Sequence, residues 1–597
     1  MIVSRLLRTP VDDRERGAAL ILVLGITVLL SGLIVAGIAY ATGAARQSQR
    51  DQSWNAALAA AYAGVEEYES RLAADLTYFS YGNPAAPFSA SSNVSLPPST
   101  SANPAFGVGP TGTWATVAGS GGDAQFRYEV DSSSFYSEGI LRVRSTGRVG
   151  TSTRSIVADL KQRGFIDFLY FTDYETSDPQ ASNPSSTLNC AIYYYEGSRP
   201  GCNVIYFGGA DDINGPMHSN DAIQTNGKAE FNGKVTTTYK ASSGKNYLRD
   251  SGTTAPVFKY PTTDPQHVSK IGMPATNAEI RKETRPDLPD EVPNPGCLYT
   301  GPTKITFHAN GTMTVVSPWT KHTNAKGNGT AGLAEAKCGS PGSAGLAKRD
   351  GSTYVGQTLD VPKNLVVYVQ NVPTLSTDVN AHTGNTPPFP SPGATACATS
   401  SNSIGFPLKG AYPSVSETPP FSKAYECRAG DLFVEGTLKG RATLAAEKYV
   451  YVTGDIAYTD KGFGGDMLGL VGNDAVWVWN PVNGSGNTLL PDNRRIDAAI
   501  LSVAHTFMVQ NYNKDSGDNK GTLTVTGAIA QKFRGPVGTG SGASMSTGFA
   551  KNYNYDERFR QTAPPKFLSP VTTTYGVNVW VEVEPAFAAD GSSLDGP

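Results

Sequence analysis

The sequence predicts an α+β protein in which a long N-terminal helix and a small antiparallel sheet precede a large all-β domain, for which we favour a β-solenoid. Three observations lead to this prediction. The 28 residues at positions 18–45 carry no charge, apolar residues then recur at helical spacing, and the rest of the chain consists of short β-type runs between turn residues. Only 17% of the 597 residues are charged, against roughly 25% in ordinary soluble proteins. With 64 Gly and 40 Pro, this composition favours turn-rich β structure over a helical enzyme.

The charge balance limits the partners that the whole chain can attract. Lys and Arg number 49 and Asp and Glu number 52, giving a formal net charge of −3. A chain without an excess of positive charge does not hold nucleic acid or anionic lipid non-specifically. Such a partner would therefore need a local basic patch.

The uncharged run at positions 18–45 is long enough to cross a membrane. As a helix it spans about 42 Å, and the hydrocarbon core of a bilayer measures roughly 30 Å. Arg5, Arg8, Arg14 and Arg16 precede it. Because the positive-inside rule counts mainly Lys and Arg, we expect these residues to stay in the cytoplasm and residues beyond 46 to be exported.

A cleaved secretory signal is the alternative interpretation, with Ala39-Tyr40-Ala41 as a small-residue cleavage site. The apolar region of such signals is usually about 7 to 15 residues, about half the length seen here. An amphipathic stripe also continues beyond the run and no Pro interrupts it, so we predict one helix over residues 18–76, crossing the membrane at 18–45. The stripe consists of Trp54, Leu58, Ala61, Tyr62, Val65, Tyr68 and Leu72.

The segment Arg14-Glu15-Arg16-Gly17-Ala18-Ala19-Leu20-Ile21-Leu22-Val23 resembles the N-terminus of type IV prepilins, in particular the PilX-like minor pilins and the large K-type pseudopilins. The alanine-rich stretch at positions 59–66 resembles the next part of a pilin helix. The resemblance implies that a prepilin peptidase removes residues 1–17 as a leader peptide. Gly17 would then be the last leader residue and Ala18 the first mature one, carrying an N-methyl group.

One position departs from the family pattern. Most pilins have glutamate as the fifth mature residue, where this sequence has Leu22. In the family that carboxylate neutralises the terminal amine of a neighbouring subunit inside the apolar filament core, where an unpaired charge is costly. A subunit without it suits the filament tip. An ordinary single-pass anchor with a coincidental glycine is the alternative interpretation.

Residues 77–163 are expected to form a small pilin-like headgroup. Positions 83–110 are rich in Ser, Pro, Ala and Asn and are typical of a linker. Three β runs follow, at 114–118, 125–130 and 140–160. In the third, Leu141 and Val143 alternate with Arg142 and Arg144, which is typical of a half-buried antiparallel strand.

Residues 164–580 are expected to form the large exported β domain, and residues 581–597 a C-terminal tail. A Val-x-Gly-x-Leu/Ile corner recurs at positions 434–438, 452–456 and 525–529. Corners of this kind favour a solenoid over a sandwich, because no paired Asn-Gly hairpin signals separate those strands. This part of the sequence resembles large pilin-like proteins with a β-solenoid on a pilin stalk, such as a competence-associated minor pilin.

Six cysteines lie beyond the membrane segment, and an even number in an exported region favours disulfides. Six cysteines allow 15 connectivities, among which we expect sequential pairing. No CxxC or close Cys/His spacing suggests a metal site, and none is expected. The expected pairs are Cys190 with Cys202, Cys297 with Cys338, and Cys397 with Cys427.

No catalytic residue or cofactor is predicted, since HExxH, GxSxG and Walker sequences are all missing from the chain. His218 beside acidic residues is the one cluster resembling a site, and such a cluster is more often a polar turn. Solenoid enzymes that cut polysaccharides use carboxylates on a lateral groove, so a membrane-tethered surface enzyme of this class is the alternative function. Its candidate acids are Asp211, Asp212, Asp221 and Asp455.

Two basic pairs are candidate ligand contacts: Lys439 with Arg441, and Lys532 with Arg534. With stacking by tyrosine they could hold DNA, although solvated strand edges explain them equally well. The resemblance implies a non-enzymatic minor pilin or pseudopilin, first in the cytoplasmic membrane and then in a surface pilus. Its expected partners are the prepilin peptidase, other pilins through the helix, the membrane, and DNA or a surface glycan.

Overall fold

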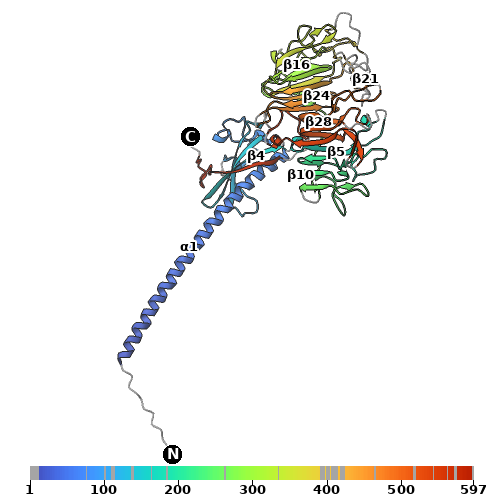
Figure 1. Ribbon diagram of the computed structural model, residues 1–597. Coiled ribbons are helices and arrows are strands. Elements are labelled where there is room, and N and C mark those ends of the chain that lie inside the picture. Colours follow the sequence, from blue (N-terminus) through green and yellow to red (C-terminus); the bar gives the residue numbers. More distant parts are fainter. Residues whose placement is uncertain are drawn as a thin grey trace, which may run out of the picture. The chain divides into compact units, whose positions relative to one another are not determined.

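The computed structural model divides the chain into two units. The small unit comprises Met1–Ser133, Leu141–Leu160 and Val579–Pro597, and the large unit Ser134–Ile140 and Lys161–Asn578 (Figure 1). The residues described are 13–75, 77–99, 102–108, 114–135, 140–162, 164–182, 186–260, 264–333, 335–389, 397, 402, 404, 415–416, 424–462, 465–483, 485–514, 520–541, 544–560, 562–570 and 575–594.

The small unit pairs one long helix with a five-stranded sheet in the order β1-β2-β3-β4-β33. Strand β2 pairs antiparallel with β1 and with β3, as the alternation in the sequence predicted. Leu141 and Val143 point into the core and are fully buried. The elements are α1 (Asp13–Ala74), η1 (Tyr78–Ser80), η2 (Pro87–Ser89), η4 (Pro104–Phe106), β1 (Ala115–Thr116), β2 (Ala124–Asp131), β3 (Ile140–Val149), β4 (Ser152–Gln162) and β33 (Tyr575–Val583).

The C-terminal end of the chain differs from the expected tail. Strand β33 completes the small sheet beside β4, so residues 581–594 belong to the small unit. Nε of Arg154 donates to Oε1 of Glu582 over 2.7 Å, and the backbone N–H of Ala586 donates to Oγ of Ser155 over 3.0 Å. The edge of β4 would otherwise expose unpaired backbone groups, and the last strand of the chain supplies their partners.

The large unit is built on one sheet that closes on itself and whose strands pair mainly in parallel. One ladder runs without a break through ten strands, in which every neighbouring pair is parallel. Its order is β14 (Cys297–Thr300), β20 (Leu365–Gln370), β23 (Arg441–Ala446), β25 (Met467–Gly472), β28 (Arg494–Val509), β29 (Thr522–Arg534), β5 (Tyr170–Ser177), β8 (Met217–Ser219), β10 (Glu230–Thr237) and β13 (Gln266–His267).

Further parallel pairs continue the sheet around the core, with one antiparallel set, β15-β16-β19. Figure 1 shows the labelled strands β16, β24, β28, β5 and β10 one above another in this order. The remaining strands of the closed sheet are β7 (Asp212–Asn214), β12 (Val257–Tyr260), β15 (Thr303–His308), β16 (Thr312–Val316), β19 (Gln357–Asp360), β22 (Leu432–Leu438), β24 (Val450–Tyr458), β26 (Val476–Val478) and β32 (Ala550–Tyr555).

Short strands and helices outside the closed sheet complete the large unit. Three of the short strands form the sheet β11-β9-β6, and the others form three two-stranded pairs. These elements are η5 (Phe165–Asp167), α3 (Pro179–Ser182), β6 (Phe207–Gly208), β9 (Gln224–Asn226), β11 (Leu248–Arg249), α4 (Ala278–Lys282), η6 (Ala336–Cys338), β17 (Arg349–Asp350), β18 (Thr353–Tyr354), β21 (Val415–Ser416), β27 (Val482–Asn483), β30 (Gly538–Ser541), β31 (Ser544–Gly548) and η7 (Glu557–Arg560).

The core consists of rows of apolar side chains stacked along the ladders. Leu444, Leu470, Ile500 and Ile529 are successive register partners, and all four are fully buried. Tyr170 of β5 extends this row as the partner of Ile529. Parallel strands stack equivalent side chains, so a run of branched apolar residues in each strand is enough to build such a row.

The Val-x-Gly-x-Leu/Ile corner predicted from the sequence lies in the neighbouring strands β22 and β24. Val434 and Val452 are register partners in the parallel pair of β22 with β24. At Gly436 φ is +108°, and a Cβ atom there would lie 2.1 Å from the backbone O of Phe307. Glycine is therefore required both for the backbone conformation and for the close approach of the next strand.

A connecting segment at residues 268–296 runs along the outside of the ladder from β10 to β14. Near its start the backbone N–H of Ile271 donates to Oδ1 of Asn220 over 2.9 Å. Further along, Nδ2 of Asn277 donates to the backbone O of Ala446 over 2.7 Å. The segment contains α4 and leads into β14 at Cys297.

Candidate functional site: the N-terminal helix

The N-terminal half of α1 has an apolar surface that nothing in the structure covers. From residue 19 to residue 52 every position is exposed, with Ile21 at 75% and Tyr40 at 81%. Within the described residues, α1 is the one helix long and apolar enough to cross a membrane. Such a helix acts as a membrane anchor or as an export signal.

The C-terminal half of the same helix packs against the small sheet through small residues. Ala57, Ala60 and Ala61 are buried there. A Cβ atom on Gly64 would lie 2.3 Å from Oγ of Ser145, and one on Gly147 of β3 would lie 2.0 Å from the backbone O of Ala57. Both glycines therefore allow the helix backbone to come into direct contact with the strand.

The predicted amphipathic stripe is correct in its C-terminal part. Val65, Tyr68 and Leu72 are fully buried, whereas Trp54 and Tyr62 are 48% and 37% exposed. The ring of Tyr62 lies 4.7 Å from that of Trp580 in β33. The contact face thus combines alanine and glycine with Val65, Tyr68 and Leu72, and Trp54 and Tyr62 lie at its margin. The predicted stripe includes Ala61 but not Ala57, Ala60 or Gly64, which also contact the sheet or lie buried against it.

The predicted processing residues lie at the start of α1, which includes Gly17 and Ala18 in its backbone. Residues 1–12 of the expected leader are outside the described part of the chain. Leu22, the position where most pilins have glutamate, is 63% exposed on the uncovered apolar surface.

The histidine and acidic cluster does not form a groove with free carboxylates. His218 is fully buried; its Nε2 donates to Oδ1 of Asn220 over 2.9 Å, and its Nδ1 lies 2.9 Å from Oγ1 of Thr236. Burial lowers the pKa of His218 to about 4, so the ring is neutral near pH 7. These contacts place His218 in the polar packing between β8 and β10.

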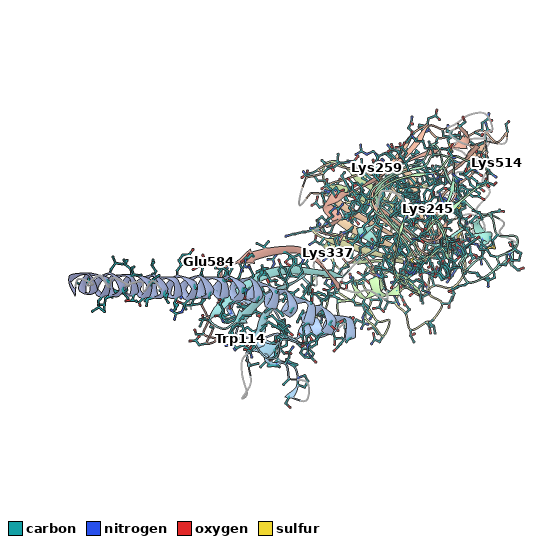
Figure 2. The ribbon with its side chains drawn as sticks, turned by 90° about the horizontal axis from the view of Figure 1, so that it is seen from below. Trp114, Lys245, Lys259, Lys337, Lys514 and Glu584 are labelled. Atoms are coloured by element: carbon teal, nitrogen blue, oxygen red, sulfur yellow. A yellow bond between two sulfur atoms is a disulfide. The ribbon has the colours of Figure 1, made fainter. Side chains whose placement is uncertain are left out.

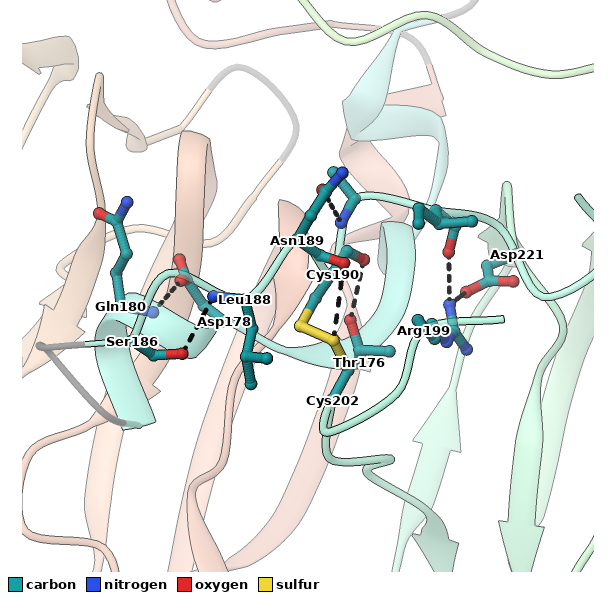
Figure 3. Close-up of a disulfide and its surroundings, with 12 residues drawn as sticks. Thr176, Asp178, Gln180, Ser186, Leu188, Asn189, Cys190, Arg199, Cys202 and Asp221 are labelled. Carbon is teal, nitrogen blue, oxygen red and sulfur yellow. Dashed lines mark hydrogen bonds and ion pairs between the residues drawn. A yellow bond between two sulfur atoms is a disulfide. The ribbon is translucent and has the colours of Figure 1, made fainter. Parts of the chain in front are cut away.

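The candidate acids are held in separate structural roles. Both carboxylate oxygens of Asp211 accept from Nζ of Lys551, at 2.9 and 2.8 Å. Asp221 is fully buried and pairs with Arg199, which lies in the loop closed by Cys190 and Cys202 (Figure 3).

The other two acids of the set lie elsewhere. Asp212 is exposed on β7, and Asp455 pairs with Arg494 at 3.1 Å. The predicted acids are thus distributed over three ion pairs and one solvated side chain, and the lateral-groove arrangement of a polysaccharide-cutting enzyme is not formed.

In each of the two predicted basic pairs, the arginine is more buried than the lysine. Arg534 is fully buried against Glu175, so its interpretation as a ligand contact is wrong. Arg441 donates from Nη2 to Oγ1 of Thr562 over 2.5 Å and to the backbone O of Ala563 over 2.7 Å. Lys439 is exposed and Lys532 half-buried. Residues two apart on a regular strand share a face, but Lys439 lies in the turn before β23, and the register of β29 shifts between Phe533 and Arg534.

All six cysteines form disulfides, and the pairing is the sequential one. The bonds join Cys190 to Cys202, Cys297 to Cys338 and Cys397 to Cys427, with Cα–Cα distances of 5.7, 5.4 and 5.8 Å. Across the described ranges, no group of three or more His, Cys, Asp or Glu side chains could hold a metal ion.

Comparisons with known proteins add only a distant likeness among solved structures. No family model matches the chain, and no curated protein matches it. Among solved structures, the competence-associated pilin ComZ from Thermus thermophilus aligns over 89% of this chain and 97% of its own, with 11% identical residues and a TM-score of 0.22. At these values neither the fold nor the function of that protein carries over to this chain.

Proposed function

We propose that this protein is a minor pilin or pseudopilin that anchors in the cytoplasmic membrane and then joins a type IV pilus-like filament. The observation that carries the proposal is the division of α1 into two halves within one unbroken 62-residue helix. One half is fixed to a folded sheet. The other is uncovered from residue 19 to residue 52 and carries no charge up to residue 45. A lipid bilayer, and later the apolar interior of a helical filament, are two environments that would cover such a surface.

A position at the filament tip follows from the residue at position 22. If Ala18 is the mature N-terminus, its amine is a positive charge that needs a partner inside the filament. Leu22 offers no carboxylate to the amine of a neighbouring subunit. At the tip no such neighbour needs one, and the large unit would then be displayed outside the cell.

The large unit is proposed to be wound as a solenoid whose turns follow the parallel ladders. Val434 pairs with Val452 after 18 residues, whereas Val525 pairs with Ile496 after 29. A varying number of residues per turn, taken up by loops between strands, explains why the corner motif has no fixed period. The competing hypothesis of a tethered polysaccharide enzyme has little support, because three of its four candidate acids are ion-paired.

Mass spectrometry of the mature N-terminus tests the proposal. Cells with a prepilin peptidase should contain a chain that begins at N-methylated Ala18, and cells without it the full-length chain. Gly17→Leu should block this processing, while Gly25→Ala in the same apolar run should not. An intact Met1 in both strains, or a start at Thr42, would contradict the proposal. Recovery of the processed chain with sheared filaments is the second expected result.

A further inference from the structure

A basic pocket lies on the large unit, where the connecting segment at 268–296 passes the end of the ladder. Its volume is about 610 Å³, and its walls come from α4 and the following turn, residues 325–329 and residues 372–378. Four cationic side chains line it, three from α4 and the turn after it and one from the loop at 325–329. They are Arg281, Lys282, Arg285 and Lys326.

Two of the four cations are neutralised by nearby carboxylates. Lys282 lies 2.6 Å from Glu279, and Arg285 lies 2.6 Å from Asp287. The other two have weaker or no such partners. Arg281 is 44% exposed and 3.7 Å from Asp378, the single acidic residue in the lining. Lys326 is exposed and makes no ion pair within the described ranges.

The loop that carries Lys326 is held in place by its own backbone. The N–H of Lys326 donates to the backbone O of Thr330 over 2.9 Å, and the N–H of Gly329 donates to the backbone O of Lys326 over 2.9 Å. The N–H of Val379 then donates to the backbone O of Gly329 over 2.9 Å, which joins this loop to the opposite wall. Two cations therefore face one pocket from walls that are already ordered, which limits the entropy lost on binding.

The size and the other lining residues indicate the class of ligand. About 300–1,000 Å³ is typical of small-molecule sites. The lining contains no aromatic residue, so a nucleic acid would find no ring on which to stack its bases. Leu375, 73% exposed, and Pro373 instead offer small apolar surfaces beside threonine side chains.

We infer that this pocket binds an acidic oligosaccharide. Arg281 and Lys326 contact its carboxylate or phosphate substituents, and Leu375 and Pro373 contact the C–H face of a sugar ring. The chemistry of the site is independent of the N-terminal helix. The use of the site as a surface receptor rests on the proposed function, which places the large unit outside the cell.

Fluorescence anisotropy with labelled oligosaccharides, using the full chain in detergent micelles, tests the inference. The probes are an oligogalacturonate, which carries carboxylates, and a phosphomannan oligosaccharide, which carries phosphates. At least one of them should bind, and which one binds identifies the substituent. Arg281→Glu combined with Lys326→Glu should raise the Kd at least ten-fold. Of the single variants at position 326, Lys326→Glu should weaken binding, whereas Lys326→Arg, which keeps the positive charge, should retain most of the affinity. Lys259→Glu on β12, also an exposed lysine of this unit, is the matched control and should leave the Kd unchanged (Figure 2).

Three results would overturn the inference: no binding of either probe, binding that the double variant does not weaken, or tighter binding of duplex DNA that the double variant abolishes. Equal melting temperatures of the variants and the wild type would show that the substitutions leave the fold intact. Failure here is distinguishable from failure of the proposed function. A processed chain that binds neither probe contradicts this inference alone, whereas an unprocessed chain that binds contradicts the pilin proposal alone.

Discussion

Nη1 of Arg534 donates to Oε2 of Glu175 over 3.1 Å, although the two residues lie 359 positions apart and both side chains are fully buried. The guanidinium also donates to the backbone O of Ile205 and lies 3.5 Å from the ring centroid of Phe207. Lys551 and Asp211 form a second pair of the same kind. Both pairs join the beginning of the large unit to its end.

Arg534→Met should destabilise the large unit by about 3–5 kcal/mol, because it leaves the Glu175 carboxylate buried without its counter-charge. Urea unfolding of the full chain in detergent would measure this loss. Arg560→Ala is the control, since Arg560 and its partner Glu557 are 57% and 65% exposed. Loss of such a surface pair should cost less than about 1 kcal/mol. Equal effects of both substitutions would contradict a special role for the buried pair.

Gly147→Ala should weaken the packing of the helix α1 against the small sheet. The added Cβ would lie 2.0 Å from the backbone O of Ala57, and backbone cannot move aside as a flexible side chain can. We expect a loss of about 1–3 kcal/mol, measured as a lower thermal unfolding midpoint of the small unit. Gly43→Ala, in the exposed part of the same helix with nothing within 4 Å, should leave the midpoint unchanged or raise it.

Removal of the Cys297 to Cys338 disulfide should cost about 2–4 kcal/mol of unfolding free energy. Both cysteines are fully buried, and the bond closes a separation of 41 residues next to β14. Double Cys→Ala variants of this bond and of the Cys190 to Cys202 bond, which closes 12 residues, can be compared by urea unfolding. Removal of the Cys297 to Cys338 bond, which closes the longer loop, should lower the unfolding free energy more than removal of the Cys190 to Cys202 bond. The reverse order would contradict the loop-entropy explanation.

Stability should fall between pH 6.5 and 4 because of His218. Burial lowers its folded-state pKa to about 4 from the ordinary 6.5, so in this range the unfolded chain binds a proton that the folded chain does not. The contribution is fully present above pH 6.5 and is lost as the pH falls to 4, amounting to roughly 3 kcal/mol. His218→Gln should lack this loss.

The difference between wild type and variant isolates this group from nearby Asp173, whose pKa burial raises. Unfolding free energies measured at pH 7 and pH 4.5 provide the comparison. A pH dependence that is identical in both proteins would contradict the assignment to His218.

The sequence predicted those parts of the fold that depend on neighbours along the chain. The alternation at Leu141 and Val143 predicted an antiparallel strand, and the recurring corner motif picked out Val434 and Val452, which are register partners. Contacts between distant segments have no such local signal. Neither the pairing of β5 with β29 nor the return of β33 to the small sheet could be derived from periodicity.

The candidate sites show the same limit. Arg534 stands beside Lys532 in a polar-looking run, and its burial is decided by Glu175, far away in the sequence. The basic pocket was missed because Arg281 and Lys326 belong to different segments, and only the connecting segment and the neighbouring loop bring them to one cavity. The small-residue part of the contact face of α1 was predicted only in part, through Ala61, because alanine and glycine contribute little to an amphipathic pattern. A search for small residues at steps of three and four would have found it.

The first and last strands of the closed sheet, β5 and β32, are both neighbours of β29. Tension applied to the two ends of the large unit therefore enters and leaves at one level in the middle of the stack. The strands of the ladder beyond that level, on either side, lie outside the path of such a force. A pull between those two ends would load the buried ion pairs that close this level, Arg534 with Glu175 and Lys551 with Asp211.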